Sequence, residues 1–263
     1  MNLKRRFAEG IPLCGTFIFS SDPATTEIAA RAGFEFVIVD REHTSLSWKD
    51  VATHVRAARG AGIGTLVRIR KVDGEEIEHA LDAGAEGAVV PHFGLDRAAS
   101  ADCVTHARYA PLGTRGTCTG TTASGYGLTN FAEVVAEANS EALIIAQIED
   151  ASVALAAEDI LSEIPVDMIM PGLADLSTSL GHPGAFAHPI VSATVDGIVR
   201  AAAARNIPMG LYIPNADALG TWKGGDVRFY VYAIDYKVIA EGYRAARRAI
   251  DRQLAATKRR AAG

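Results

Sequence analysis

Leu143-Ile-Ile-Ala-Gln-Ile-Glu149 and Val166-Asp-Met-Ile-Met-Pro-Gly-Leu-Ala-Asp-Leu-Ser177 are two short apolar runs, each of which leads to a carboxylate. An amphipathic segment suited to a crossover helix lies between them. In a parallel βαβ unit both strands point the same way, so their C-terminal ends share one edge of the sheet. We therefore expect the carboxylates of Glu149 and Asp175 to stand side by side at that edge.

This pair of carboxylates is a candidate metal site. Two carboxylates brought close together repel each other unless a proton or a cation lies between them. Oxygen ligands with waters completing the shell suit Mg²⁺ or Mn²⁺ better than zinc. The alternative is that Glu149 or Asp175 only caps the helix that follows it, since acidic residues are common there.

Length and composition favour one α/β domain that comprises residues 1–263. The chain has 263 residues, 49% hydrophobic and 22% charged, which is enough for one sizeable core. The net charge of −5 and the pI near 5.8 do not suggest a nucleic-acid surface. No apolar stretch approaches the length of a membrane span.

The cysteines indicate a reducing compartment. Cys14, Cys103 and Cys118 have no metal-like spacing and form no C-x-x-C pair, which is typical of reduced thiols. The basic residues Lys4-Arg5-Arg6 are not followed by an apolar run long enough for a signal peptide. We expect a cytoplasmic protein.

Strand signals recur along the chain, mostly alternating with helix signals. Eight βα units with no Pro/Ser-rich linker predict a closed (β/α)₈ TIM barrel, with an open doubly wound sheet as the alternative. The absence of a G-x-G-x-x-G motif after the first strand weakens a dinucleotide-binding interpretation. A long last helix is expected from Tyr236 to about Ala256. The predicted strands are 13–19, 34–40, 65–70, 86–91, 142–149, 166–171, 207–213 and 227–233.

One segment departs from this alternation. About fifty residues separate the fourth and fifth strands, far more than an ordinary connection. They include two helical stretches, 96–106 and 130–139, and a loop rich in Gly and Thr over 108–127. We expect this loop on the C-terminal side of the strands, where long ordered loops are often functional lids.

Polar and ionisable residues gather where strands end, from several parts of the chain. In a TIM barrel the chemistry is found at the C-terminal ends of the strands. This convergence is stronger evidence for a functional site than any single motif. The residues are Asp40, Arg41, Glu42, His43, Arg68, Arg70, His92, Gln147, Glu149, Asp175 and Asp235.

Two arginines on the third predicted strand differ by two positions, so Arg68 and Arg70 are expected to face the same side. A buried arginine is costly without an anion. Arg68 could grip a carboxylate or steady an enolate oxygen. It could equally be a structural partner of a barrel carboxylate such as Asp40, and for Arg70 the structural interpretation is favoured.

His43 is the best placed histidine for catalysis, on a loop directly after a strand. Asp40 lies three residues before it and could orient its imidazole and keep it basic. Asp40, Glu42 and His43 could instead form a metal site of their own, although such short mixed clusters are common by chance.

Taken together and in order, several segments resemble the HpcH/HpaI aldolase family, the metal-dependent 2-keto-3-deoxy acid aldolases, over almost the full chain. The segments are Glu27-Ile-Ala-Ala-Arg-Ala-Gly-Phe34, Val39-Asp-Arg-Glu-His43, Val67-Arg68, Leu81-Asp-Ala-Gly-Ala85, Val89-Val-Pro91, Arg108-Tyr-Ala-Pro-Leu-Gly-Thr-Arg-Gly116, Gln147-Ile-Glu149 and Ala174-Asp-Leu-Ser-Thr-Ser-Leu-Gly181.

The resemblance implies a role for several residues. Glu149 and Asp175 match the two ligands of a divalent metal, which would be Mg²⁺, Mn²⁺ or Co²⁺. His43 matches the catalytic histidine, with Asp40 as its partner. Arg68 matches the arginine that stabilises the pyruvate enolate.

The substrate and the assembly follow from the same resemblance. Gln147 matches a residue beside the bound ketoacid, and Gly172 with the backbone around Ala174 matches the part that holds its carboxylate. Proteins that this chain resembles are typically hexamers, trimers of dimers that exchange the last helix. The implied partners are small-molecule ketoacids and aldehydes and further copies of the chain.

Several positions differ from the usual family pattern. Leu173 stands where proline is common, Arg41 where small or neutral residues are usual, and Phe17 where tryptophan is common. These differences bear on which aldehyde is accepted. They also leave room for a relative with different chemistry, such as the macrophomate-synthase-like or citrate-forming branches.

The resemblance therefore predicts a carbon–carbon lyase. It would cleave a 4-hydroxy-2-oxo acid reversibly into pyruvate, or a related 2-oxo acid, and an aldehyde. The alternatives are oxaloacetate decarboxylation coupled to condensation, and an inactive barrel that only binds a ketoacid. No Schiff-base lysine is well placed, since Lys71 alone lies directly at a strand end and alternation points it away from Arg68.

Overall fold

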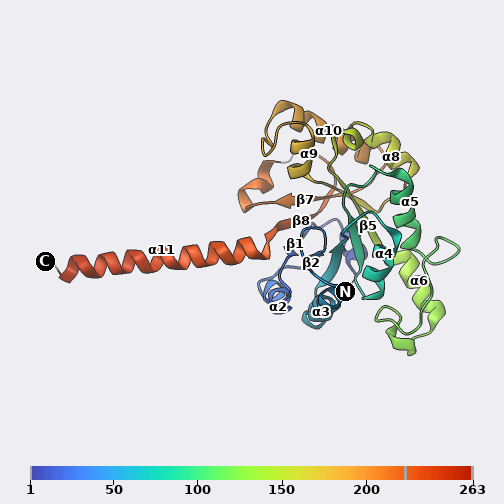
Figure 1. Cartoon of the computed structure of the whole chain (residues 1–263), viewed down its shortest axis with the longest axis horizontal. Coiled ribbons are helices and arrows are strands. Elements are labelled where there is room, and N and C mark those ends of the chain that lie inside the picture. Colours follow the sequence, from blue (N-terminus) through green and yellow to red (C-terminus); the bar gives the residue numbers. More distant parts are fainter. Residues whose placement is uncertain (1, 222–223, 262–263) are drawn as a thin grey trace.

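A closed parallel β-barrel forms the centre of the protein in our computed structural model, which describes residues 2–221 and 224–261 (Figure 1). The eight strands follow one another around the barrel in sequence order, and β8 pairs with β1. The predicted (β/α)₈ barrel is confirmed, and the open doubly wound alternative is wrong. The strands are β1 (Leu13–Ile18), β2 (Phe36–Asp40), β3 (Gly64–Arg68), β4 (Gly87–Val90), β5 (Leu143–Ile148), β6 (Met168–Pro171), β7 (Met209–Ile213) and β8 (Val227–Ile234).

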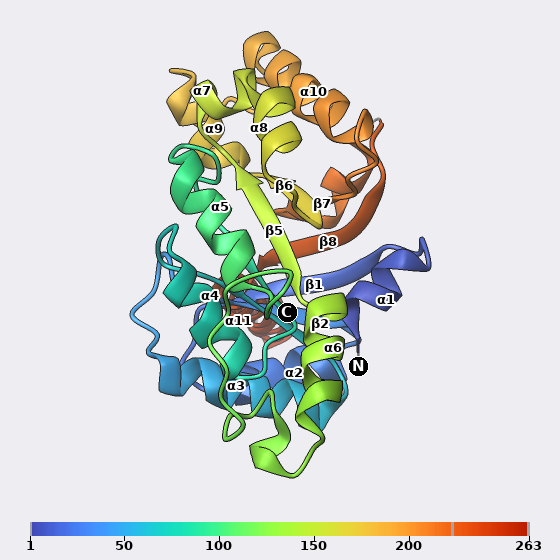
Figure 2. The same ribbon diagram turned by 90° about the vertical axis from the view of Figure 1, so that its right-hand side faces the viewer.

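Helices cover the outside of the barrel, as Figure 2 shows around β5. Neighbouring helices pack in pairs, such as α2 with α3, α4 with α5, and α8 with α10. The helices are α1 (Leu3–Ala8), α2 (Ala24–Arg31), α3 (Trp48–Ala61), α4 (Gly74–Asp82), α5 (Arg97–His106), η1 (Gly125–Gly127), α6 (Phe131–Glu141), α7 (Ala151–Leu155), α8 (Ala157–Glu163), α9 (Leu173–Ser179), α10 (Pro189–Ala203), η2 (Ala216–Thr221) and α11 (Asp235–Ala261).

Burial on both faces explains why the strands are nearly continuous apolar runs. All residues of β2, β3 and β5 are buried. Strands of an all-parallel sheet face the barrel interior on one side and helices on the other, so both sets of side chains must be apolar. Polar residues within such strands are therefore exceptional, and Arg68 and Gln147 are two of them.

The first helix closes the N-terminal end of the barrel. Leu3 and Phe7 of α1 are almost fully buried. The Phe7 ring lies 6.0 Å from the Phe36 ring and 5.4 Å from the Phe229 ring, centroid to centroid. This aromatic cluster fills the barrel interior at the N-terminal ends of the strands. An open site must therefore lie at their C-terminal ends.

The long loop between α5 and α6 does not lie where the sequence analysis placed it. Helix α5 has already returned to the N-terminal end of the barrel, and the loop begins there. Arg108 Nη2 lies 3.1 Å from the carboxylate of Asp167, which directly precedes β6, and Arg115 Nη2 lies 2.7 Å from Asp82 at the end of α4. The expectation of a lid over the C-terminal ends within one chain is therefore wrong. Helix α5, which follows β4, already brings the chain back to the N-terminal end of the barrel before the loop begins.

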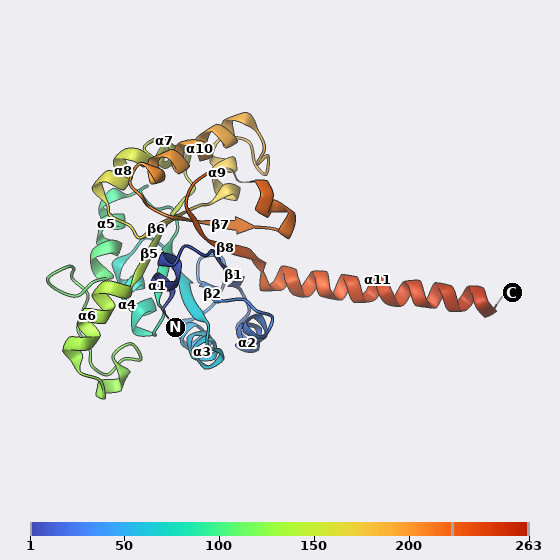
Figure 3. The same ribbon diagram turned by 180° about the vertical axis from the view of Figure 1, so that it is seen from behind.

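Helix α11 extends away from the barrel (Figures 1 and 3). It begins at Asp235 and ends at Ala261, longer than expected, and its contacts with the barrel are to β1 and β8 near its start. Over the described residues, no helix is both long and apolar enough to cross a membrane.

Candidate active site

Seven of the eight predicted site residues line one cavity of about 380 Å³ at the C-terminal ends of the strands. The eighth, Asp40, is completely buried beside it. The structure therefore brings together residues that lie far apart in the sequence, as the barrel prediction requires. The seven residues are His43, Arg68, Gln147, Glu149, Gly172, Ala174 and Asp175.

Arg68 is held in place by two carboxylates and an aromatic ring. It pairs in register with Asp40 on the neighbouring strand, and its Nε lies 2.5 Å from Asp40 Oδ1. Its Nη1 lies 3.2 Å from Glu42 Oε2, and its guanidinium lies 4.6 Å from the centroid of the Phe17 ring. The guanidinium is thus fixed by partners and still lines the cavity, so both interpretations offered for Arg68 have a geometric basis.

Arg70 does not face the site. Strand β3 ends at Arg68, and the backbone N–H of Arg70 donates to Glu76 Oε2 at 3.3 Å. Because the strand has ended, alternation no longer applies, and the side chain of Arg70 is exposed. The expectation that Arg68 and Arg70 face the same side of one strand is wrong.

Asp40 does not contact the imidazole of His43. Its carboxylate accepts the backbone N–H of His43 at 3.0 Å and that of Glu42 at 3.3 Å, which is the local turn that an aspartate readily forms. The side chain of His43 is 54% exposed at the cavity, and its Nε2 lies 3.6 Å from Glu42 Oε2. The carboxylate that faces the imidazole of His43 is thus that of Glu42. The predicted contact between Asp40 and the imidazole is not formed.

Glu149 lies directly beyond the end of β5 and is 1% exposed. Its Oε1 accepts the backbone N–H of His92 at 2.8 Å, and its Oε2 accepts a hydrogen bond from Gln147 Nε2. A Cβ at Gly172 would lie 2.3 Å from Glu149 Oε2, so glycine is required for the carboxylate to occupy this position. Burial raises the pKa of Glu149, and the charge of Glu42 adds to this, whereas the bonds from Gln147 and His92 lower it.

Asp175 approaches the cavity from the next βα connection. It lies in the first turn of α9, which begins two residues after β6 ends. Glu149 and Asp175 therefore line the same cavity, one from β5 and one from α9. Asp175 lies in the first turn of α9 and lines the cavity, but no side chain caps this helix through a hydrogen bond, and a role of Asp175 as a metal ligand stays a prediction.

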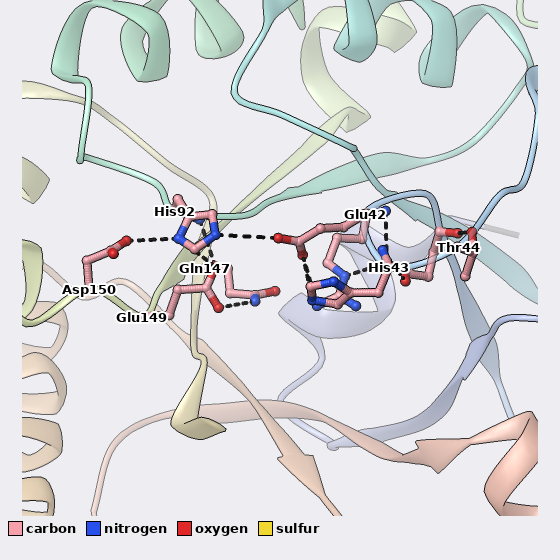
Figure 4. A network of polar contacts seen from close by, with 9 residues as sticks. Glu42, His43, Thr44, His92, Gln147, Glu149 and Asp150 are labelled. Carbon is pink, nitrogen blue, oxygen red and sulfur yellow. Dashed lines mark hydrogen bonds and ion pairs between the residues drawn. The ribbon is translucent and has the colours of Figure 1, made fainter. Parts of the chain in front are cut away.

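His92 was noted at the end of the fourth strand but given no role, and the structure brings it into the site. Oxygen or nitrogen atoms of Glu42, His92 and Glu149 lie within 4.8 Å of one another, as ligands of a single ion would (Figure 4). The alternative cluster of Asp40, Glu42 and His43 is not formed, because Asp40 binds Arg68 and backbone N–H groups instead. The dipeptide Pro91-His92 at a strand end was the available signal in the sequence.

The donor atoms of the site fit a divalent cation. Glu42 Oε2 and Gln147 Oε1 are buried without a hydrogen-bond partner among the described residues. Burial raises the pKa of Glu42, the cations Arg68 and His92 oppose this, and the carboxylates of Asp40 and Asp175 add to it. Crowded carboxylates and unsatisfied oxygens are both stabilised by a cation between them.

Other polar residues from the sequence analysis have structural roles. Asp235 accepts the backbone N–H groups of Phe19 and Ser20, each at 3.0 Å, which joins the start of α11 to the loop after β1. Lys71 is 66% exposed and pairs with Asp73 on the surface. Among the described residues no lysine lines the cavity; Lys223 lies outside the described residues.

A closed TIM barrel with carboxylates, an arginine and a histidine around a cavity at its C-terminal end defines an enzyme. The HpcH/HpaI aldolase/citrate lyase family model matches residues 13–241. The chain belongs to this family, and its relatives identify it as a carbon–carbon lyase.

Two curated relatives are similar along most of their length. The 2-dehydro-3,6-dideoxy-6-sulfogluconate aldolase of Pseudomonas putida is 32% identical, over 89% of this chain and 89% of the relative. The hydroxypyruvate/pyruvate aldolase of Paraburkholderia phytofirmans is 32% identical, over 89% of this chain and 91% of the relative.

Solved structures agree with this assignment. The HpcH/HpaI aldolase from Desulfitobacterium hafniense DCB-2 has a TM-score of 0.88 and 30% identity, covering 95% of this chain and 96% of that one. The citrate synthase SbnG has a TM-score of 0.85 and 29% identity, covering 96% of this chain and 98% of that one. An aldolase and a citrate synthase therefore share this fold, and the chain is similar in sequence to each of them, at 30% and 29% identity.

Proposed function

We propose that this protein is a metal-dependent aldolase that cleaves a 4-hydroxy-2-oxo acid reversibly into pyruvate, or a related 2-oxo acid, and an aldehyde. One observation carries the proposal: Arg68, Glu149, Asp175 and His43, from four different βα units, line a single cavity. The activities named for the curated relatives are consistent with it.

Glu149 and Asp175 would hold the divalent metal, which we propose to be Mg²⁺, Mn²⁺ or Co²⁺. When bound, this ion supplies Lewis acidity that draws electron density from the 2-oxo group of the ketoacid. The buried carboxylate of Glu149 is kept in one position by Gln147 and by the backbone of His92. A ligand fixed in this way does not need to be reorganised when the ion binds.

Gln147, Gly172 and Ala174 would position the ketoacid. Gly172 leaves space directly beside Glu149, where a side chain would collide with the carboxylate. The N–H groups of the first helical turn have no carbonyl partner within the helix. Those around Ala174 at the start of α9 are therefore suited to bind the substrate carboxylate.

Arg68 would stabilise the enolate that forms when the C3–C4 bond breaks. Its guanidinium is fixed by Asp40 and Glu42 before the substrate arrives. Preorganised donors of this kind favour the transition state because they point at the position where negative charge develops. The pairing with Asp40 then serves catalysis by orienting Arg68.

His43 would move the proton of the 4-hydroxyl group. In cleavage its imidazole accepts this proton, the electron pair of the C3–C4 bond passes to the enolate, and the aldehyde leaves. Protonation at C3 then gives pyruvate. Glu42, 3.6 Å from the ring, is the carboxylate suited to stabilise the protonated imidazole, and Asp40 acts through the backbone of the His43 loop.

A second candidate function is decarboxylation of oxaloacetate coupled to condensation of the resulting enolate with another electrophile. The structural similarity to a citrate synthase supports it. Both reactions use the same enolate residues and differ in the electrophile. An inactive ketoacid-binding barrel is less consistent with the structure, since a pure binding site does not require His43.

We also propose that the protein is a homo-oligomer, a hexamer built as a trimer of dimers in which α11 is exchanged. Several large apolar residues of α11 are exposed in the single chain. An amphipathic helix is stabilised mainly by packing its apolar face. They are Tyr236, Val238, Ile239, Tyr243, Ile250 and Leu254.

A cytoplasmic location is proposed because the structure gives Cys14, Cys103 and Cys118 as free thiols. We propose that residues 1–263 act as one catalytic domain.

The proposed function is tested by incubating pyruvate or hydroxypyruvate with a panel of aldehydes and Mg²⁺, Mn²⁺ or Co²⁺, and identifying products by mass. An aldol adduct whose formation requires a metal supports the proposal. Formation of a citrate-like product from oxaloacetate, without any aldol adduct, favours the second candidate. No product from any pairing contradicts both.

A further inference from the structure

His92 lies between three carboxylates (Figure 4). Its Nδ1 lies 3.0 Å from Asp150 Oδ2 and 3.6 Å from Glu149 Oε1, and its Nε2 lies 3.6 Å from Glu42 Oε1. Its backbone N–H also binds Glu149 at 2.8 Å. The side chain and the backbone of His92 therefore both face the carboxylates of the site.

The backbone of His92 is in an uncommon conformation. Its φ is 47°, in the left-handed region that few residues other than glycine adopt. Such conformations persist only where the surrounding structure holds them, and they cluster at functional sites. Here the left-handed turn directs the N–H of His92 to Glu149 while its ring reaches Glu42 and Asp150.

The hydrogen bond to Asp150 prepares the ring for a metal. A metal-binding histidine almost always donates the N–H of its other ring nitrogen to a carboxylate or carbonyl, which fixes the tautomer and orients the ring. With Nδ1–H donated to Asp150, the lone pair of His92 is on Nε2, the nitrogen that faces Glu42. This is the carboxylate–histidine arrangement of metal sites.

Independent support comes from a buried polar atom of the same site that accepts no hydrogen bond. Gln147 is 3% exposed, yet its Oε1 has no hydrogen-bond partner among the described residues. Glu42 Oε2 accepts no hydrogen bond there either, and its nearest cation is the Arg68 guanidinium at 3.2 Å. Two ligands of one ion, each at about 2.0–2.2 Å, lie up to about 4.4 Å apart. The donor atoms of Glu42, His92 and Glu149, within 4.8 Å of one another, are close to that separation, and Asp175 is not part of this cluster.

We propose that Nε2 of His92 is a ligand of the divalent metal that Glu149 holds, next to the carboxylate of Glu42 and with Asp150 fixing the ring. This inference rests on the proposed function and adds an imidazole to the carboxylate ligands. It has a consequence for metal choice. Imidazole suits first-row transition metals, whereas Mg²⁺ prefers oxygen ligands alone. The protein therefore selects Mn²⁺ or Co²⁺ over Mg²⁺.

Pulsed EPR of Mn²⁺ bound to the full-length protein tests the inference directly, since a coordinated imidazole gives a nitrogen hyperfine coupling. We expect this coupling in the unaltered protein and its change on labelling with ¹⁵N-histidine. The His92→Asn variant keeps the backbone N–H to Glu149, and asparagine tolerates a positive φ. It should lose the coupling and bind Mn²⁺ roughly 10–100-fold more weakly, as measured by EPR titration.

Two comparisons make this experiment decisive. Binding of Mg²⁺, measured by competition with Mn²⁺, should change by less than about threefold in His92→Asn, since Mg²⁺ gains little from a nitrogen ligand. His43→Gln should keep the nitrogen coupling, because the ring of His43 lies outside the cluster of Glu42, His92 and Glu149.

The outcomes separate this inference from the proposed function. Tight Mn²⁺ binding and metal-dependent activity without any nitrogen coupling in the unaltered protein would overturn the role of His92 alone. Loss of the coupling in His43→Gln, with its retention in His92→Asn, would also overturn it. Failure of the unaltered protein to bind Mn²⁺, with activity independent of metal, would overturn both.

Discussion

Asp40 and Arg68 are register partners on adjacent strands, and Nε of the arginine lies 2.5 Å from Oδ1 of the aspartate inside the barrel. The pair is almost completely buried, and Arg68 also borders the cavity. A buried ion pair costs desolvation and is weak as a stabilising device. Its position is better explained if Asp40 holds the guanidinium of Arg68 toward the reacting ketoacid.

The first prediction separates catalysis from folding at Arg68. Arg68→Lys keeps the charge and loses the planar fork, so turnover should fall by about 10²–10³, the size typical of losing one preorganised donor. Ketoacid binding should weaken less, because the enolate oxygen carries more charge than the ketone oxygen. Steady-state kinetics with thermal melting measures both effects.

Arg70→Lys is the matched control, since Arg70 lies two residues away on the same segment with an exposed side chain. It should leave turnover unchanged. If Arg68 were only a structural partner of Asp40, Arg68→Lys would melt earlier while its folded fraction turned over almost normally.

The second prediction concerns the space beside Glu149. Gly172→Ala introduces a Cβ 2.3 Å from Glu149 Oε2, and the φ of −92° does not exclude alanine, so the collision and not the backbone is the obstacle. Displacing a fixed ligand should weaken Mn²⁺ binding roughly 10–100-fold. Calorimetric titration of the metal measures this.

Gly60→Ala on α3 provides the comparison, because a Cβ there meets nothing within 4 Å. Metal binding should be unchanged, and the variant should be more stable by about 0.5–1 kcal/mol, since glycine is unfavourable inside a helix. Unchanged metal binding in Gly172→Ala would show that Glu149 is not held as described.

The third prediction concerns the type of enolate chemistry. No lysine lines the cavity in the part of the chain that the structure describes, and Lys71 is paired with Asp73 on the surface. Borohydride added with pyruvate should therefore trap no covalent adduct. A mass increase mapped by peptide analysis to any lysine would contradict a mechanism that needs no Schiff base.

The fourth prediction concerns stability and pH at His54, outside the site. This histidine is completely buried, with Nδ1 2.8 Å from Thr26 Oγ1 and Nε2 2.9 Å from the carbonyl of Ser20. Burial lowers its pKa, although the bond to Ser20 and nearby carboxylates oppose this. Above the ordinary histidine value of about 6.5, His54 is neutral in both states and contributes no pH dependence.

Below that pH the unfolded chain takes up a proton that the folded protein resists, so the free energy of unfolding falls as pH falls toward the lowered pKa of His54. For one group the slope is at most about 1.4 kcal/mol per pH unit. Denaturant unfolding between pH 7.5 and 5.5 should show a smaller decrease in His54→Gln than in the unaltered protein. His79→Gln, on an exposed helix surface, should keep the full decrease, and equal slopes for all three proteins would contradict the assignment.

Much of the fold and the site could be predicted from the sequence for a physical reason. Strands buried on both faces must be apolar along their length, so polar residues at their ends, such as Glu149, are conspicuous. Parallel strands bring those ends together, which is why residues from four βα units meet in one cavity. The closed barrel was predictable on this basis, whereas the family was recognised from the motifs that resemble it.

The remaining features depend on geometry that the sequence pattern does not contain. Alternation placed Arg70 beside Arg68, but β3 ends before Arg70 and the rule no longer applies. Asp40 was expected to orient His43 through its ring, whereas it binds the backbone N–H of His43 and leaves the ring to Glu42. His92 joins the site through a left-handed turn that neither composition nor spacing reveals.

Exchange of the methyl protons of pyruvate with D₂O, followed by mass spectrometry, tests the central claim most directly because it requires only enolisation in this site and no knowledge of the aldehyde. We predict deuterium incorporation with Mn²⁺, Co²⁺ or Mg²⁺, its loss on chelation, its return when metal is restored, and a decrease of about 10²–10³ in Arg68→Lys. Full exchange in rigorously metal-free protein, or an unchanged rate in well-folded Arg68→Lys, would contradict the account.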